Sequence, residues 1–532
     1  MAEQFAVRRL KVSGVRLSEM DEAALRPALA VVLDIPSARI ASLQIVRRSL
    51  DARQRTVLYD YCLVVDIHLD DAELARVTAD RRVSLYREEP FPSPGPHMHM
   101  QKRPVVVGCG PAGLFAALAL AERGCPPLVI ERGGRIPERV AAVQGFWKCG
   151  ELDPESNAVF GEGGAGTFSD GKLTARGTSP FKQRVLKELV ACGADGDILY
   201  DTRAHVGTDR LRRVIPALVD SLQQRGVAFR FNTRMDDITI EQGRVRAVRI
   251  DGEKLQTDMV VLAVGHSARD TVRMLAQRGI SIHPKGFAVG VRIEHPQELI
   301  DRAMRRDESA RSKYGPADYA LKHQDTASGR GVYSFCMCPG GLVIGCASQP
   351  ETLCVNGMSF SNRAGSRANA AIVVTIAPGD FEAGDALGGI VFQEHIERLA
   401  YAAGVNSYFA PAQLAADFMY GRASINLPCD DISFTPGVTP VDLGGVLPGI
   451  IVEPLRRGLA EFDRKISGFI EQGVLIGVET RTSSPVRMLR DPFTLQAEGI
   501  AGLVPVGEGA GYAGGIVSSA VDGLRAAWKV IC

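Results

Sequence analysis

Residues 103–133 read RPVVVGCGPAGLFAALALAERGCPPLVIERG and decide the fold. The run of valines predicts a short buried strand that leads into the glycine pattern Gly108-x-Gly110-x-x-Gly113. An Ala/Leu-rich helix follows, and a second short strand ends at Glu131. Strand, glycines, helix and strand in this order form the βαβ fingerprint that binds the diphosphate of an adenine dinucleotide.

Each glycine of this fingerprint has a backbone role. The first permits a tight turn, the second lets backbone amides approach the diphosphate at the helix N-terminus, and the third lets helix and strand pack closely. The acid after the second strand accepts hydrogen bonds from a ribose diol. A chance GxGxxG is the alternative, which the accompanying strands, helix and acid disfavour. We expect the cofactor to contact Gly108, Gly110, Pro111, Ala112, Gly113, Glu131 and Arg132.

A second glycine-rich stretch, FGEGGAGTFSDGK, occupies residues 160–172. Ordering so much bare backbone costs entropy, so we expect this segment to bind a ligand. Its successive amides suit an anion-binding nest near the same diphosphate, with contacts from Gly163, Gly164 and Lys172. It is not a Walker loop, because no Gly-Lys-Ser/Thr ends it. A mobile surface loop is the alternative.

Residues 226–265 predict an extended piece, a hairpin and a buried apolar strand that stops at Gly265. This arrangement resembles the glutathione-reductase-like class of two-domain FAD proteins, in which such a hairpin precedes an Ala-Thr-Gly motif. Here Val264 replaces the threonine and removes a hydroxyl. The resemblance implies FAD as the non-covalent cofactor, with contacts at Met235 and Gly265.

Near the carboxyl end, residues 499–530 read GIAGLVPVGEGAGYAGGIVSSAVDGLRAAWKV. An apolar strand ends at Gly507-Glu508, and a helix begins near Gly515-Ile516. The same class has Gly-Asp at the strand end, where the carboxylate binds a hydroxyl of the cofactor. Its helix N-terminus faces the flavin pyrimidine, where reduction accumulates negative charge. Glu508 is one methylene longer than that aspartate, so its reach must differ.

A more specific resemblance rests on several motifs together. The stretches VFGEGGAGTFSDGKL, YSFCMCPGG, VNGMSFSNRAGSRAN, GVETRTSSPVRM and VGEGAGYAGGI resemble a poorly characterised family of bacterial and plastid FAD-dependent dehydrogenases. The resemblance spans about residues 100–532 and implies FAD and an oxidoreductase activity. It does not supply the substrate.

The expected fold class is α/β, with a Rossmann-like FAD-binding domain interrupted by an α+β substrate domain. A small N-terminal α+β domain, ferredoxin-like in type, precedes them. It is either a docking or RNA-binding module or a structural appendage. The predicted boundaries are 1–92 for the small domain, 93–102 for a proline-rich linker, 103–285 and 476–532 for the FAD-binding domain, and 286–475 for the substrate domain.

Composition indicates an ordinary folded protein. Of 532 residues, 45% are hydrophobic and 23% charged, and the net charge is +1. A net charge so close to zero gives no overall electrostatic attraction for nucleic acid or anionic lipid, so neither is expected as a partner. The 11 cysteines are scattered rather than arranged as a disulfide framework, which favours a reducing compartment. With no apparent signal peptide or membrane span, we expect a cytoplasmic protein.

Cys336 and Cys338 are the catalytic candidates, since a thiol pair can exchange electrons with a flavin. Against this, the side chains of a Cys-x-Cys strand are expected to diverge, and a hairpin turn at residues 339–341 explains the segment equally well. A metal site is not expected, because two further ligands at suitable spacing are missing.

The substrate candidates are Arg363 and Arg367, in a polar segment, and Arg481, in another just before the last flavin motif. Two such segments converging on the flavin would form an anion-selective pocket. Solvated loops are the alternative.

The leading hypothesis is an FAD-dependent oxidoreductase that transfers hydride between flavin N5 and an unidentified, anionic small molecule. NAD(P)H stays open as a transient reductant, because the sequence has no second fingerprint for its own domain. The alternative is a flavin-binding nucleic-acid or assembly factor that recognises its partner through residues 1–92. A flavin monooxygenase or halogenase is a third option, but the sequence has no dedicated signature for either activity.

Overall fold

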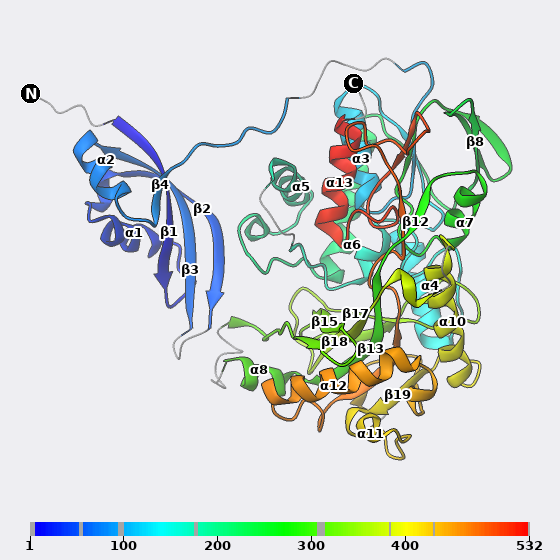
Figure 1. Cartoon of the computed structure of the whole chain (residues 1–532). Coiled ribbons are helices and arrows are strands. Elements are labelled where there is room, and N and C mark those ends of the chain that lie inside the picture. The colour runs from blue at the N-terminus through cyan, green and yellow to red at the C-terminus, as the bar shows by residue number, and fades with distance from the viewer. Residues whose placement is uncertain are drawn as a thin grey trace, which may run out of the picture. The chain divides into compact units, whose positions relative to one another are not determined.

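The computed structural model describes residues 6–52, 57–93, 100–174, 179–305, 314–381, 385–428 and 431–529 (Figure 1). The chain divides into two compact units. The first comprises Met1–Pro92, Arg176–Val190 and Asp195–His205, and the second comprises the rest. Most of the predicted linker, residues 94–99, lies outside the described residues.

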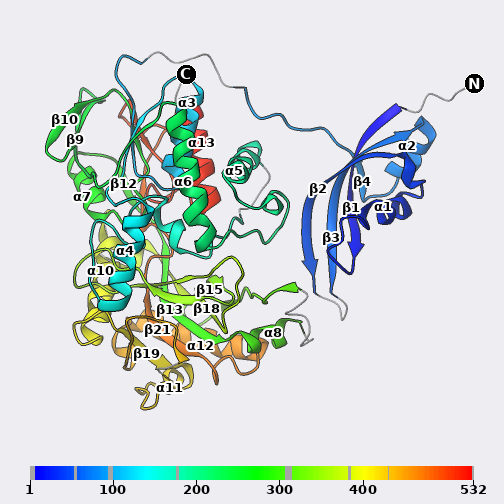
Figure 2. The same cartoon turned by 180° about the vertical axis from the view of Figure 1, so that it is seen from behind.

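The first unit is built on one antiparallel sheet in the order β2-β3-β1-β4 (Figure 2). Leu25, Leu29 and Leu33 of α1 are buried, because a spacing of four residues places side chains on one helix face. The elements are β1 (Ala6–Leu17), α1 (Leu25–Leu33), β2 (Ile40–Asp51), β3 (Leu58–Leu69), α2 (Asp71–Thr78) and β4 (Val83–Leu85).

A distant segment completes this unit. The backbone N–H of Arg48, in β2, donates to the carbonyl of Tyr200 at 2.8 Å. The side chain of Arg48 pairs with Asp201 at 2.7 Å and with Asp197 at 3.1 Å. The unit therefore includes residues that the sequence analysis assigned to the FAD-binding domain.

In the second unit, the predicted Rossmann-like sheet is present and wholly parallel, in the order β23-β11-β5-β6-β7. Its inner strands are short and apolar because helices or loops cover both faces. Helix α3 (Pro111–Glu122) packs against α13 (Ile516–Lys529), and Figure 1 shows the two side by side. The strands are β5 (Val105–Val107), β6 (Leu128–Ile130), β7 (Ala228–Arg230), β11 (Val260–Leu262) and β23 (Leu503–Pro505).

Parallel strands end at the same edge of a sheet, and ligands of such sheets bind there. The strands β5, β6, β11 and β23 therefore deliver four of the predicted contacts to one edge. These are Gly108, Glu131, Gly265 and Gly507. The predicted hairpin is also present, as an antiparallel meander of β8 (Met235–Glu241), β9 (Arg244–Ile250) and β10 (Glu253–Gln256).

The central third forms a seven-stranded sheet in the order β14-β15-β18-β13-β21-β19-β20. Helix α12 (Gly449–Lys465) packs on β13, β14, β15 and β18. Strand β21 crosses the predicted boundary at residue 475, so this sheet extends to Glu479. The strands are β13 (Phe287–Pro296), β14 (Lys322–Asp325), β15 (Arg330–Cys338), β18 (Arg367–Ile376), β19 (Ala410–Leu414), β20 (Val438–Pro440) and β21 (Val474–Glu479).

The predicted hairpin at residues 339–341 is wrong. Strand β15 pairs with β14 and β18, whereas β16 (Leu342–Gly345) pairs only with β17 (Val355–Met358) in a separate sheet. The turn therefore links two sheets. A Cβ on Gly341 would lie 2.5 Å from the carbonyl oxygen of Met358, so the chain at this crossing passes too close for a side chain.

None of the described helices is both long enough and apolar enough to cross a bilayer.

Candidate functional site

Two glycine segments meet at the N-terminus of α3. Gly110 is the N-cap, and no side chain caps the amides of the first turn. Gly163 and Gly164 have φ of 84° and 63°, and a Cβ on Gly164 would lie 2.9 Å from the Cα of Gly110. Only bare backbone fits at this approach. The amides of Gly163 and Gly164 donate to the carbonyls of Cys109 and Gly161, each at 2.9 Å, so these two amides do not form the predicted nest. The uncapped first turn of α3 is the part of this site that suits an anion.

Glu131 connects the fingerprint to the glycine-rich loop. Its carboxylate accepts from the amides of Cys109 at 2.8 Å, Gly133 at 3.0 Å and Gly161 at 2.9 Å. A carboxylate offers about four acceptor positions, so these bonds leave room for one ribose hydroxyl. Glu131 therefore lies directly after the second strand of the fingerprint, as predicted. It also helps to hold the glycine-rich loop in place.

Two other predicted cofactor residues have internal partners for their side chains. Arg132 pairs with Glu155 at 3.0 Å and with Asp270, and lies over the ring of Phe160. Met235 is 4% exposed and packs in the core under the parallel sheet. Their contacts with the cofactor stay predictions.

Sequence reasoning missed Arg139, in α4 (Ile136–Cys149). Its fully buried guanidinium donates to the carbonyls of Asn157 at 2.8 Å, Ala158 at 3.0 Å and Glu162 at 2.7 Å. Burial lowers its pKa to about 10. The signal that could have found it is an arginine within the apolar stripe of α4, whose other members are Ile136, Val143 and Phe146.

The carboxyl-terminal motif adds a third segment to the same place. A Cβ on Gly507 would lie 2.7 Å from the Cβ of Ala112, in α3. A Cβ on Gly166 would lie 3.0 Å from Cγ1 of Ile516, the first residue of α13. The N-termini of α3 and α13 therefore both border the glycine-rich loop. Gly515, with φ of 119°, precedes α13.

Glu508 has a partner that the sequence analysis left unassigned. Its Oε1 lies 3.3 Å from Nδ1 of His266, and the two side chains are 23% and 13% exposed. His266 follows Gly265 at the end of β11. The pair joins the ends of two neighbouring strands, β11 and β23.

Lys172 points away from the predicted nest. Its ammonium donates to the carbonyl of Met337, between the two candidate cysteines. The expectation that Cys336 and Cys338 diverge is wrong, because residues two apart on a strand share a face. The two thiols hydrogen-bond to each other, in a bulge where Cys336 has φ of 46°.

The surroundings of Cys336 favour a thiolate. The hydrogen bond from Cys338 lowers the pKa of Cys336 to about 5, and Arg292 and Lys172 add to this against the effect of burial. Arg292 donates to the Cys336 carbonyl at 3.0 Å and pairs with Glu479 at 2.6 Å. Burial raises the pKa of Glu479 to about 7.

Each of the three candidate substrate arginines has an internal partner. Arg363 donates from Nε to Asp170 at 3.0 Å, and Arg367 lies 3.6 Å from Asp431. Arg481 pairs with Glu397 at 2.8 Å. The structure brings Arg363 to the glycine-rich loop through Asp170, but the three arginines share no partner.

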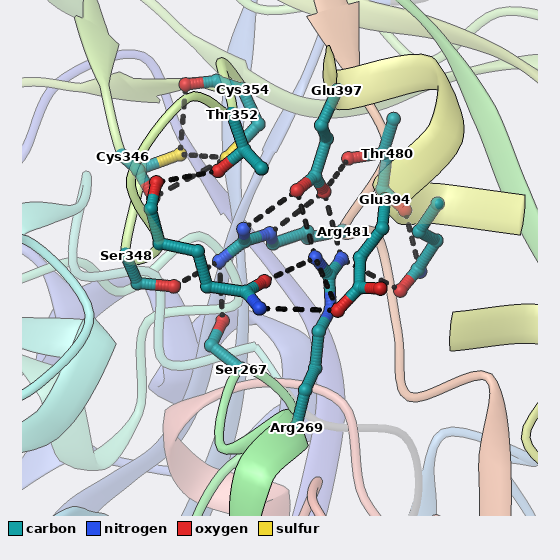
Figure 3. Close-up of polar contacts among 12 residues, drawn as sticks. Ser267, Arg269, Cys346, Ser348, Thr352, Cys354, Glu394, Glu397, Thr480 and Arg481 are labelled. Carbon is teal, nitrogen blue, oxygen red and sulfur yellow. Dashed lines mark hydrogen bonds and ion pairs between the residues drawn. The ribbon is translucent and has the colours of Figure 1, made fainter. Parts of the chain in front are cut away.

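Arg481 belongs to a buried network (Figure 3). Glu397, in α10 (Gly388–Ala403), is fully buried and accepts from both Arg481 and Arg269, each at 2.8 Å. Arg481 also donates to Ser267 at 3.1 Å and to Ser348 at 2.7 Å. Arg269 opens α7 (Arg269–Gln277), so the network ties the end of the FAD-binding segment to the seven-stranded sheet.

Four family models match parts of the chain. Residues 103–264 match a FAD binding domain, and residues 186–345 match the family FAD dependent oxidoreductase. Residues 286–482 match the family FAD-dependent protein, C-terminal domain-like, and residues 9–66 match a domain of unknown function. The uncapped first turn of α3, beside bare glycine backbone, fits the diphosphate of FAD. The fold and the site thus define an FAD-binding flavoprotein of the oxidoreductase class with a Rossmann-type sheet, as the sequence predicted.

A protein of Clostridium beijerinckii, described as an uncharacterized protein, is 42% identical over 527 residues, which cover 98% of each chain. The chain belongs to the same family as this protein. The protein FixC of Salmonella typhi is 29% identical over 209 residues, which cover 37% of this chain and 44% of FixC.

Similar solved structures include a geranylgeranyl bacteriochlorophyll reductase-like protein of Thermoplasma acidophilum. It has a TM-score of 0.34 and 12% identity, and the match covers 80% of this chain and 76% of that one. CtdE in complex with FAD has a TM-score of 0.30 and 13% identity, with coverage of 80% and 84%. None of the comparisons supports the nucleic-acid or assembly alternative.

Proposed function

We propose that this protein transfers hydride between N5 of bound FAD and a small anionic molecule, with Cys336 as the reactive group of the chain. The observation that carries the proposal is the contact of Lys172 with the Met337 carbonyl, because it places both candidate thiols against the glycine-rich loop. FAD supplies the two-electron chemistry when bound.

The residues of the chain have separable roles in this scheme. The amides of the first turn of α3 bind the diphosphate, the bare backbone of Gly164 allows the close approach beside it, and Glu131 orients the ribose. The N-terminus of α13 stabilises negative charge on the reduced ring. Cys336 as a thiolate holds a proton-accepting sulfur beside the loop, and Cys338 is its hydrogen-bond donor.

Charge around the thiols favours an anion in this place. Arg292, Lys172 and Arg363 supply three cations, and Asp170 and Glu479 supply two carboxylates, of which Glu479 titrates near neutral pH. The Cys336 thiolate balances this excess in the resting protein. A substrate carboxylate or phosphate would meet the same field when Cys336 is protonated.

We also infer a specific fold type for each of the two units. The order βαββαβ with the sheet order β2-β3-β1-β4 supports a ferredoxin-like first unit. The parallel sheet, meander and closing strand β23 support a glutathione-reductase-like second unit.

The function is tested by anaerobic reduction of the purified flavoprotein with a panel of carboxylates, phosphates, NADH and NADPH. We expect at least one anionic metabolite to bleach the flavin in a saturable manner. If only uncharged compounds bleach it, the anionic substrate class is wrong. If dithionite alone bleaches the flavin, the proposed transfer of hydride from a metabolite to FAD is wrong as well.

The low pKa of Cys336 predicts how its alkylation rate depends on pH. With a pKa of about 5, Cys336 is deprotonated across neutral pH, so its iodoacetamide rate should change less than about twofold between pH 6 and pH 8. A simple thiol of pKa ~8.5 should change about 80-fold over the same range. The rate at Cys336 is read by peptide mass spectrometry.

The matched variants are Lys172→Met, which removes a neighbouring cation, and Lys254→Met on the exposed strand β10. We expect only Lys172→Met to slow alkylation at pH 6, because it raises the pKa of Cys336. Equal pH profiles for Cys336 and the simple thiol would refute the thiolate.

A further inference from the structure

A second pair of cysteines faces each other at the open end of β16 and β17. Gly345 and Val355 are the last registered partners of these strands, so Cys346 and Cys354 are the next cross-strand pair. The amide of Cys346 donates to the carbonyl of Cys354 at 2.9 Å, and the two sulfurs lie 3.5 Å apart (Figure 3). The side chains are 4% and 1% exposed. Nothing in the proposed function uses them.

We propose that Cys346 and Cys354 form an oxidisable dithiol that closes to an intramolecular disulfide. Directly opposed residues of an antiparallel pair have Cα atoms about 4.5–5.5 Å apart, within the range of about 4.4–6.8 Å that a disulfide spans. The sulfurs must approach from 3.5 Å to about 2 Å, which side-chain rotation can provide without moving the strands.

The buried network places positive charge beside this pair. Arg481 donates to Ser348, which lies between the two cysteines in the chain, and two buried guanidiniums share the single carboxylate of Glu397. Glu394 is paired with Arg273 at 2.7 Å and lies 4.0 Å from Arg269, so cations still exceed carboxylates. The charge of Arg481 acts against burial and against the hydrogen bond with Cys354, both of which raise the pKa of Cys346.

The pKa of Cys346 decides which role this thiol takes. The hydrogen bond with Cys354 raises the pKa of Cys346, with burial acting in the same direction. Cys346 is therefore assigned as the resolving thiol, which leaves Cys354 as the attacking sulfur.

Burial restricts the oxidant to a small uncharged hydroperoxide, such as hydrogen peroxide. The Cys354 sulfur attacks one peroxide oxygen and gives up its proton, the O–O bond breaks, and the other oxygen leaves as water, giving a sulfenic acid. The Cys346 sulfur then attacks the sulfenic sulfur and releases water. In total, two thiols lose two electrons and two protons, and one peroxide becomes two waters.

The test uses the FAD-loaded full-length protein, treated with hydrogen peroxide and then alkylated after unfolding. Cleavage after Arg330, Glu351 and Arg363 separates the two cysteines into peptides 331–351 and 352–363. We expect these peptides to be joined and lighter by two hydrogens, while Cys109, which is buried alone, remains alkylated. Repeating this with Cys336→Ser/Cys338→Ser assigns the bond to Cys346 without ambiguity.

A second experiment identifies which of the two sulfurs attacks the peroxide. In Cys346→Ser, a cyclic 1,3-diketone should trap a sulfenic acid at Cys354, and in Cys354→Ser it should trap at least tenfold less at Cys346. Separate, fully alkylated peptides after peroxide would overturn the proposal, and so would a disulfide that joins Cys354 to Cys336 or Cys338. Equal trapping in the two variants would overturn the assignment of the attacking sulfur.

Discussion

Replacing Glu397 with glutamine is expected to lower the free energy of unfolding by about 3–5 kcal/mol, among the largest effects of any single side chain here. Glu397 is the shared carboxylate of Arg269 and Arg481, which are 1% and 7% exposed. The amide keeps the shape but removes the negative charge, so Arg481 is left buried without its counter-ion and Arg269 keeps only Glu394, at 4.0 Å. Chemical denaturation followed by circular dichroism measures the loss.

The same pair predicts a pH dependence. Burial alone would raise the pKa of Glu397, but Arg269 and Arg481 outweigh it and hold that pKa well below its usual range. A carboxyl whose pKa is lower in the folded state stabilises the fold fully above its unfolded pKa, about 4.3, and loses this as the pH falls. The stability difference between wild type and Glu397→Gln should therefore shrink below about pH 4.

The matched control is Glu453→Gln, which removes a carboxylate paired with Arg456 at 2.8 Å but 56% exposed. Exposed pairs contribute about 0–1 kcal/mol, so this variant should unfold close to wild type. If the two variants lose equal stability, the buried network does not hold α10 and β21 as described.

Replacing Arg139 with methionine is expected to empty the cofactor site as well as to destabilise the protein. The guanidinium is the donor for three carbonyls of residues 157–162, and each buried group left without a partner costs about 1–3 kcal/mol. These carbonyls belong to the segment that enters the glycine-rich loop, so the loop should lose its shape. Flavin absorbance per purified chain measures the occupancy.

The control for Arg139 is Arg135→Met at the start of the same helix, where the side chain is exposed and stacks on Phe231. This variant should keep its FAD. A yellow Arg139→Met protein with wild-type occupancy would show that the loop does not depend on this arginine.

The sequence predicted the parallel sheet because its signals are local. The valine run, the glycine spacing and Glu131 lie within one βαβ unit, so neighbouring residues specify the element and its ligand edge. The meander was predictable for the same reason, since its turns at Gly243 and Gly252 lie between the strands they join.

What could not be predicted depends on partners far apart in the chain. Glu397 binds Arg269 and Arg481, which are 128 and 84 residues away, and no local pattern specifies such a pairing. The sequence therefore offered these arginines as substrate ligands and gave no sign of their internal partners. The turn after Cys338 looked like a hairpin because local residues favour a turn, whereas strand pairing is decided by the whole sheet.

FAD binding is proposed to depend on the first turn of α3, which holds the diphosphate where the bare backbone of Gly164 passes Gly110. The most direct measurement is the titration of apo-protein with FAD for wild type, Gly164→Val and Gly145→Ala, a helix position where a Cβ meets nothing within 4 Å. We predict tight, stoichiometric binding for wild type and Gly145→Ala, and at least 100-fold weaker binding for Gly164→Val with its far-ultraviolet circular dichroism unchanged. Wild-type affinity in Gly164→Val, or a wild-type protein that takes up no FAD, would contradict the account.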